Sequence, residues 1–159
     1  MEGAATSSTP KARIDLTDAF NVERGNDGQI RLSYGSTGTH GLTVEVNDGV
    51  LSLDVKASQD ATVRATKGSG TDMVASAMQR LAQEGVEVNS VEAYWLHPTL
   101  AGEGNTVNWS EFMANRANGL SLEDSARATW TGRFFGNYGF TNPQQFVLGN
   151  NAVELTFGR

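Results

Sequence analysis

The chain has 159 residues, of which 38% are hydrophobic and 19% charged, and its formal net charge is −6. A chain of this length buries roughly two-thirds of its unfolded surface, which is enough for one domain with a packed core. It contains no cysteine, which excludes disulfides, thiolate nucleophiles and sulfur-based zinc sites. The acidic balance argues against nucleic acid as a partner.

The first residues are small and polar and lack an apolar segment, so we predict a flexible linker over 1–12 and a single domain over 13–159. No run of about 18 apolar residues occurs and the first ten residues lack an apolar h-region, so neither a membrane span nor a signal peptide is expected. The two histidines, His40 and His97, are far apart in the sequence. They lack the spacing of metal ligands, so no metal centre is expected.

Residues 15–55 alternate between apolar and polar side chains, which is the period of half-buried strands. Two turn sequences, Gly25–Gly28 and Asn47–Gly49, lie between the alternating runs and contain residues that tolerate a positive φ. The pattern predicts four strands in a meander. Their alternating apolar residues are Phe20 and Val22; Ile30, Leu32 and Tyr34; Leu42, Val44 and Val46; and Leu51, Leu53 and Val55.

A glycine turn follows an extended, strand-like segment and precedes an amphipathic helix predicted over about 71–84, after which 86–96 is predicted to be a strand. Two glycines spaced by one residue let backbone N–H groups approach an anion, and the positive end of the helix dipole attracts it. The same spacing also occurs in tight turns that bind nothing. The turn consists of Lys67, Gly68, Ser69, Gly70 and Thr71.

The last third of the chain is predicted to contain two helices and a hairpin. A short helix covers 108–117, and a second helix begins with a capping box at Ser121 and runs with one apolar face to Gly139. Two strands, 146–148 and 153–157, are predicted to form a C-terminal hairpin. Together these elements predict an α+β fold with a mixed, mostly antiparallel sheet and about three helices.

From about residue 50 onward, the order of elements resembles the GNAT family of N-acetyltransferases. The shared order is strands, a glycine turn that opens a helix, a strand, a helix that ends near Gly139 and Phe140, and a terminal hairpin. The resemblance implies acetyl-coenzyme A (acetyl-CoA) as cofactor and an amine of a small molecule or a protein as acyl acceptor. It also implies a pyrophosphate site, which comprises Gly68, Ser69, Gly70 and Thr71, with Lys67 as a nearby charge partner.

The GNAT resemblance also implies a general acid, which in the family is often a tyrosine at the position that Phe135 occupies here. Because phenylalanine cannot donate a proton, we consider three other residues for the acid and base that acyl transfer to an amine requires. They are Tyr138 beside the helix-ending glycine, His97 at the end of a strand, and Glu92 within that strand. Each also has an ordinary explanation, as a core ring, a surface histidine and a solvent-facing carboxylate.

A second resemblance is to C-terminal toxin domains of bacterial polymorphic and Rhs-type proteins. It is carried by Trp95, Asn108, Phe112, Gly119, Ser121, Ala126, the segment Thr129–Arg133, Gly139 and Phe140. It implies an effector that a secreted carrier delivers into a target cell and that an immunity protein neutralises; without a carrier, the expected location is the cytoplasm. The alternative function is a toxin or interaction domain that keeps the architecture, has no coenzyme A chemistry and acts around Thr129–Arg133.

Overall fold

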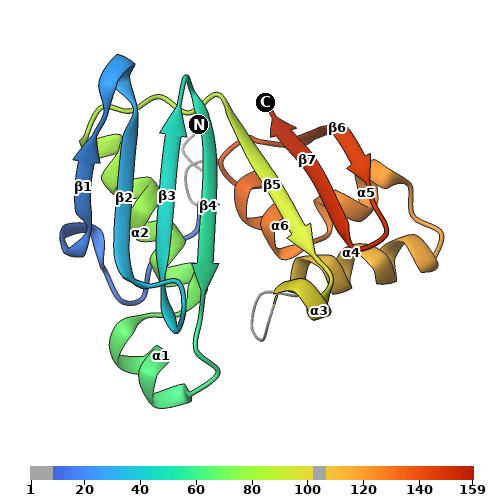
Figure 1. Ribbon diagram of the computed structural model, residues 1–159, viewed down its shortest axis with the longest axis horizontal. Helices are drawn as coiled ribbons and strands as arrows, with labels where there is room; N and C mark the ends of the chain where they lie inside the picture. Colours follow the sequence, from blue (N-terminus) through green and yellow to red (C-terminus); the bar gives the residue numbers. More distant parts are fainter. Residues whose placement is uncertain (1–8, 102–106) are drawn as a thin grey trace, which may run out of the picture. The chain divides into compact units, whose positions relative to one another are not determined.

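The computed structural model describes residues 9–101 and 107–159 (Figure 1). Contacts within the chain divide it into two compact units, one formed by Lys11–Asn89 and the other containing Ser90–Arg159. Each unit combines antiparallel strands with helices, so the predicted α+β class with a mostly antiparallel sheet is confirmed. The predicted linker over 1–12 lies largely outside the described residues, and the single domain over 13–159 stays a prediction.

The first unit contains the predicted meander of four antiparallel strands. Ladders join β1 to β2, β2 to β3, and β3 to β4. The alternating apolar side chains lie on one face, whereas the other face is polar. Asp48 and Gly49, both with positive φ, form the turn between the last two strands. The strands are β1 (Asn21–Arg24), β2 (Ile30–Ser36), β3 (His40–Asn47) and β4 (Val50–Lys56).

Two helices follow the meander, α1 (Ala61–Lys67) and α2 (Gly70–Gln83). The helix predicted over about 71–84 is therefore confirmed, and α2 buries its apolar side chains against β3 and β4. The prediction of an extended segment before the glycine turn is wrong, because that segment is α1. Most side chains of α1 are exposed, so burial imposes no apolar period on its sequence. Its start is instead set by the N-cap Asp60, whose carboxylate accepts the N–H groups of Thr62 and Val63.

The second unit contains a three-stranded antiparallel sheet in which β7 (Ala152–Gly158) lies between β5 (Ser90–Leu96) and β6 (Asn142–Leu148). The predicted C-terminal hairpin is confirmed, although β6 begins four residues earlier than expected and contains a bulge between Gln144 and Val147. The strand predicted over 86–96 begins only at Ser90. The buried face of the sheet carries Val91, Ala93, Trp95, Val153, Leu155 and Phe157.

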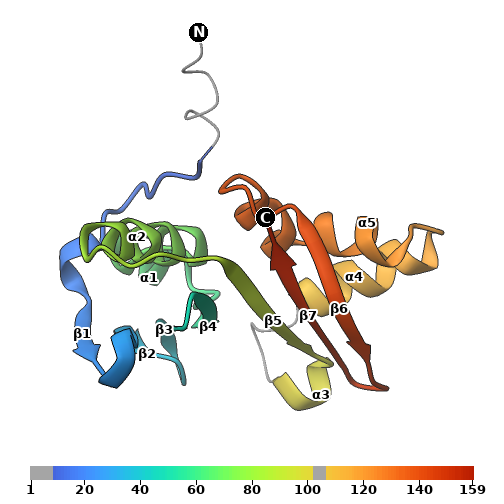
Figure 2. The same cartoon turned by 90° about the horizontal axis from the view of Figure 1, so that it is seen from above.

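Four helical segments accompany this sheet: α3 (Pro98–Ala101), α4 (Val107–Ala117), α5 (Leu122–Arg127) and α6 (Trp130–Gly136). Figure 2 shows α4, α5 and α6 on one side of β5, β6 and β7, and, in the first unit, α2 on one side of the meander. The prediction of a single helix from Ser121 to Gly139 is wrong, because the helix is interrupted at Ala128 and Thr129, between α5 and α6. Thr129 starts the second helix by accepting the N–H of Gly132 at 3.0 Å.

Candidate functional site

The glycine turn connects α1 to α2. Gly68 ends α1 with a φ of 91°, and its N–H donates to the Arg64 carbonyl at 3.1 Å. Ser69 begins α2 with a capping box, in which its hydroxyl accepts the N–H of Asp72 at 3.1 Å and the Asp72 carboxylate accepts the N–H of Ser69 at 2.9 Å. The predicted phosphate turn is therefore a helix-to-helix junction that opens α2.

Asp72 is the buried acid of this junction, with only 2% of its surface exposed. Its carboxylate also accepts the backbone N–H groups of Arg13 at 2.8 Å and Ile14 at 3.5 Å. Burial raises the pKa of Asp72, but the hydrogen bonds from Ser69, Arg13 and Ile14 together lower it by more than burial raises it. The pKa of Asp72 therefore lies below its usual value. A carboxylate of the chain itself thus occupies part of the position predicted for a phosphate.

Two other N–H groups at the start of α2 stay open. Within the described residues, the N–H groups of Gly70 and Thr71 have no hydrogen-bond partner. Gly70 has ordinary backbone angles, and an added Cβ would lie 3.8 Å from the nearest atom, the Cβ of Ala57. By contrast, Gly68 has a positive φ, and an added Cβ would lie 2.9 Å from Leu16 Cδ1. The fold thus requires Gly68 but not Gly70.

A hollow of about 450 Å³ lies at this helix start. Three of its lining side chains are cationic and one, Asp72, is anionic. None of the three cations forms an ion pair with another described residue. The predicted residues Ser69 and Thr71 line the hollow, whereas Lys67, Gly68 and Gly70 do not. The lining consists of Lys11, Arg13, Ala61, Arg64, Ala65, Ser69, Thr71 and Asp72.

Two strand residues fasten the turn from the sheet side. The hydroxyl of Tyr34 donates to the Lys67 carbonyl at 3.1 Å, and His40 Nε2 lies 3.4 Å from the same oxygen. His40 is buried, and its Nδ1 accepts the N–H of Ser58 at 2.9 Å, which assigns the proton of the neutral ring to Nε2. Sequence reasoning considered His40 only as a metal ligand and missed this role, because its partners are far away in the chain.

The three predicted catalytic residues all lie in the second unit, whereas the glycine turn lies in the first. His97 is at the end of β5, where its Nδ1 accepts the N–H of Thr99 at 3.1 Å and lies 2.9 Å from the Thr99 hydroxyl. Its ring contacts Trp109 edge-on, with centroids 5.6 Å apart. These contacts orient the ring and leave Nε2 without a hydrogen-bond partner among the described residues.

Tyr138 and Glu92 lie in different environments. Tyr138 is half-buried at the end of α6, with its ring centroid 5.4 Å from that of Phe134, and burial raises the pKa of its hydroxyl. Glu92 lies on the exposed face of β5, opposite to the face that carries Trp95, which packs on Phe112 of α4. The structure therefore does not bring Glu92 and Tyr138 to the same side of the sheet.

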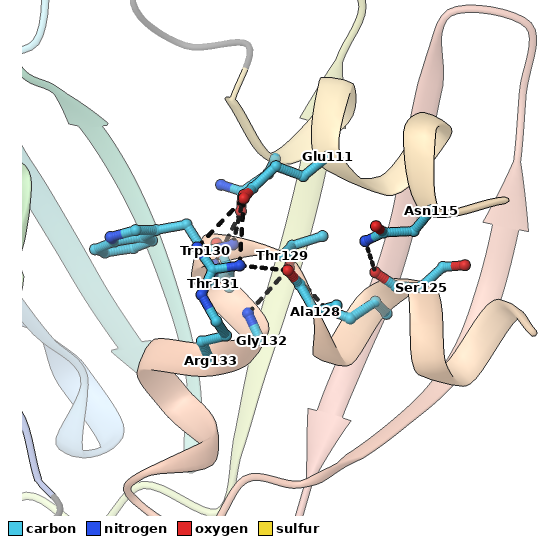
Figure 3. Close-up of polar contacts among 11 residues, drawn as sticks. Glu111, Asn115, Ser125, Ala128, Thr129, Trp130, Thr131, Gly132 and Arg133 are labelled. Carbon is cyan, nitrogen blue, oxygen red and sulfur yellow. Dashed lines mark hydrogen bonds and ion pairs between the residues drawn. The ribbon is translucent and has the colours of Figure 1, made fainter. Parts of the chain in front are cut away.

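The segment Thr129–Arg133, predicted as an alternative site, forms the start of α6 (Figure 3). Glu111 from α4 accepts the N–H of Trp130 at 2.7 Å and pairs with Arg133 at 3.2 Å. Asn108, also from α4, accepts the N–H of Thr131 at 2.9 Å. Side chains of the protein therefore occupy this helix start and join α4 to α6, which gives the segment a structural role.

Across residues 9–101 and 107–159, no group of three or more histidine, aspartate or glutamate side chains lies close enough together to hold a metal ion. No helix in this part of the chain is long and apolar enough to cross a membrane. The sequence matches no family model, and neither a curated protein nor a solved structure shows significant similarity to it.

Proposed function

We propose that the chain is an acyl-coenzyme A-dependent N-acyltransferase of the GNAT type, whose coenzyme phosphates occupy the hollow at the start of α2. The observation that carries the proposal is the combination of two N–H groups without a described partner, on Gly70 and Thr71, with three nearby cations that form no ion pair with a described residue: Lys11, Arg13 and Arg64. Helix N-termini attract phosphate groups, and arginine binds their oxygens through two parallel hydrogen bonds. The chain has a net charge of −6, but three cations and only one carboxylate, that of Asp72, line the hollow, which favours an anionic ligand.

The order of elements supports the same proposal. The strand meander is followed by α1, by the glycine turn that opens α2, by β5, by the helices α3 to α6, and by the hairpin β6–β7. Apart from α1 and the helices α3 to α5, this is the order on which the resemblance to GNAT enzymes depends. Fold alone does not establish an activity, so the site must carry the functional proposal.

In the proposed reaction, the nitrogen of an amine attacks the thioester carbonyl, a C–N bond forms and the C–S bond breaks. A base takes the proton of the amine, and an acid protonates the departing thiolate. Tyr138 suits the acid, because a phenol hydroxyl is protonated at neutral pH and burial raises the pKa of this one. His97 suits the base, because Thr99 engages its Nδ1 and its Nε2 has no hydrogen-bond partner among the described residues. Glu92, on the exposed face of β5, is the third candidate for the acid or base.

Calorimetry with coenzyme A tests the cofactor site. We expect the parent to bind, and Gly70→Val to weaken binding at least about tenfold because its side chain obstructs close approach of a phosphate. Its melting temperature should stay within a few degrees, since the fold does not require glycine there. Gly38→Val is the control, because Gly38 is exposed, belongs to the same unit and is outside the lining. A parent that binds no coenzyme A would refute the cofactor site.

Acetylation of a panel of amines tests the catalytic part. Tyr138→Phe keeps the ring, so a decrease in turnover of about 100-fold with unchanged stability would support an acid role for the hydroxyl. The variants His97→Asn and Glu92→Gln test the other two residues in the same assay. If the parent acetylates no amine, the enzyme proposal fails. If the parent is active and all three variants keep its turnover, the assignment of the acid and base fails.

The alternative proposal is a toxin or interaction domain without coenzyme chemistry. One observation favours it: the Asp72 carboxylate already accepts the N–H of Ser69, as it would in a turn that binds nothing. The same calorimetry separates the two proposals. Inhibition of bacterial growth by the chain expressed in the cytoplasm, in the absence of coenzyme A binding, would support the toxin, and rescue by a co-expressed protein would identify its immunity partner.

A further inference from the structure

A short N-terminal segment lies along α2 and is held there by its backbone. We call residues 11–17 the strap; Figure 2 shows it in blue beside α2. Three residues of α2 spaced by four, Asp72, Ser76 and Arg80, bind it one turn after another. Asp72 accepts the N–H of Arg13 at 2.8 Å. Ser76 Oγ accepts the N–H of Leu16 at 2.9 Å, and Arg80 donates to the Thr17 carbonyl at 2.8 Å.

The strap also contacts the glycine turn. Leu16 is buried, and its side chain packs so closely on Gly68 that a Cβ there would lie 2.9 Å from Leu16 Cδ1. Within the strap, Asp15 accepts the N–H of Thr17 at 2.9 Å, which fixes the local turn. One end of the strap is therefore anchored by polar bonds and an apolar contact. The other end carries Lys11 and Arg13, both of which line the hollow.

We infer that the strap completes the anion site, and that Asp72, Ser76 and Arg80 are positioning residues that hold Lys11 and Arg13 at the hollow. This inference rests on the proposed function. Two of the three cations of the hollow come from the strap and only Arg64 comes from α1, so release of the strap removes most of the positive charge. An anion that binds the protein more tightly when the strap is docked than when it is released also stabilises the docked strap. By linkage, the ratio of the two affinities equals the factor by which the bound anion shifts the docking equilibrium.

Limited trypsin digestion measures docking directly, because cleavage between Arg13 and Ile14 requires release of the N–H groups that Asp72 binds. Ser76→Ala removes the acceptor for Leu16, and Arg80→Gln removes the donor to Thr17; neither residue lines the hollow. We expect each variant to accelerate this cleavage about fivefold and to weaken binding of inorganic pyrophosphate by about three- to tenfold. Glu84→Gln is the matched control, because it weakens the Glu84–Arg80 pair but leaves the bond from Arg80 to Thr17 in place.

Saturating pyrophosphate should slow the same cleavage in the parent. Faster cleavage in both Ser76→Ala and Arg80→Gln, together with weaker pyrophosphate binding, supports the inference. Faster cleavage with unchanged affinity overturns it, because the strap would then dock without serving the site. Unchanged cleavage also overturns it, because Ser76 and Arg80 would then not hold the strap. If the parent binds neither pyrophosphate nor coenzyme A, the proposed function fails first, and the inference fails with it.

Discussion

The helices α2 and α6 begin with similar caps but differ in what happens to their backbone N–H groups. A hydroxyl caps each one, Ser69 for α2 and Thr129 for α6. At α6 the first four N–H groups all have partners: the Ala126 carbonyl, Glu111, Asn108 and the Thr129 hydroxyl. At α2 the capping box serves the first and fourth, and within the described chain the N–H groups of Gly70 and Thr71 have none.

This difference shows how a structural helix start is distinguished from a candidate binding site. Unpaired N–H groups at a helix start must be satisfied by side chains, water or a ligand. At α6, side chains of α4 accept these N–H groups: Glu111 that of Trp130 and Asn108 that of Thr131. The polar cluster of Figure 3 is therefore explained without a ligand. The start of α2 instead faces a hollow lined by three cations that form no ion pair with a described residue, which suits an anion from outside the chain.

The largest effect is expected from Gly132→Ala at the closed start. A Cβ there would overlap the Ala126 carbonyl oxygen and lie 2.7 Å from the Arg127 carbonyl oxygen, so backbone must move. We expect the free energy of unfolding to fall by about 3 kcal/mol, as for overpacked positions. Urea denaturation measures it. Gly136→Ala, in the same helix with no atom within 4 Å, is the control and should be neutral or stabilising. Similar losses in both variants would contradict the close packing of α5 on α6.

A second test separates the two glycines at the open start. Gly68→Ala should lower the free energy of unfolding by about 2 kcal/mol, because alanine is strained at a φ of 91° and would crowd Leu16. Gly70→Ala should change it by less than about 0.5 kcal/mol, because Gly70 has space and ordinary angles. Thermal unfolding of both variants compares them. Equal destabilisation would mean that the fold requires both glycines, which would remove one reason for a ligand.

The sequence predicted the elements whose side chains repeat with a clear period. The alternation from Ile30 to Val55 predicted the meander, and the apolar positions of α2 predicted its helix, because burial on one face imposes the period directly. The helix α1 was missed because no face of it is buried and its start depends on Asp60. The break before α6 was missed because Trp130 and Phe134 continue the spacing of Leu122 and Ala126, while the cap at Thr129 divides them.

The candidate site was only partly predictable. The turn residues Ser69 and Thr71 were found from their local spacing, and both line the hollow. Lys11 and Arg13 were not, since they reach it through a strap whose contact with Asp72 spans 59 residues of sequence. His40 was missed for the same reason, because its bond to Ser58 and its contact with Lys67 exist only after the strands pair. Such long-range contacts leave no periodic signal in the sequence.

A smaller effect, with a defined pH dependence, is expected from Asp72. Its pKa is lower in the folded chain than the ordinary value of about 3.9 in an unfolded one, so its contribution to stability is complete above that value. The contribution is lost as the pH falls through the folded-state pKa, because the protonated form accepts the N–H bonds poorly. Asp72→Asn should cost about 1 kcal/mol at pH 7 and flatten the decline of stability below pH 4. Urea midpoints from pH 7 to pH 2 measure this, and an unchanged acid slope would contradict it.

The smallest effect is expected from Lys67, which the sequence predicted as a charge partner of the phosphate but which does not line the hollow. Arg64, one turn earlier on α1, does. Exposed charges near a site contribute little through solvent, whereas a lining guanidinium can contact the anion. Lys67→Gln should therefore weaken pyrophosphate binding less than about twofold and Arg64→Gln by about three- to fivefold.

Arg31→Gln, an equal change of charge on the polar face of the meander, is the control. Calorimetry at 0.1 M and 1 M salt separates contact from distant attraction, because the screening length falls from about 10 Å to about 3 Å. If Lys67→Gln weakens binding as much as Arg64→Gln at both salt concentrations, the anion lies on the glycine turn itself and not in the hollow.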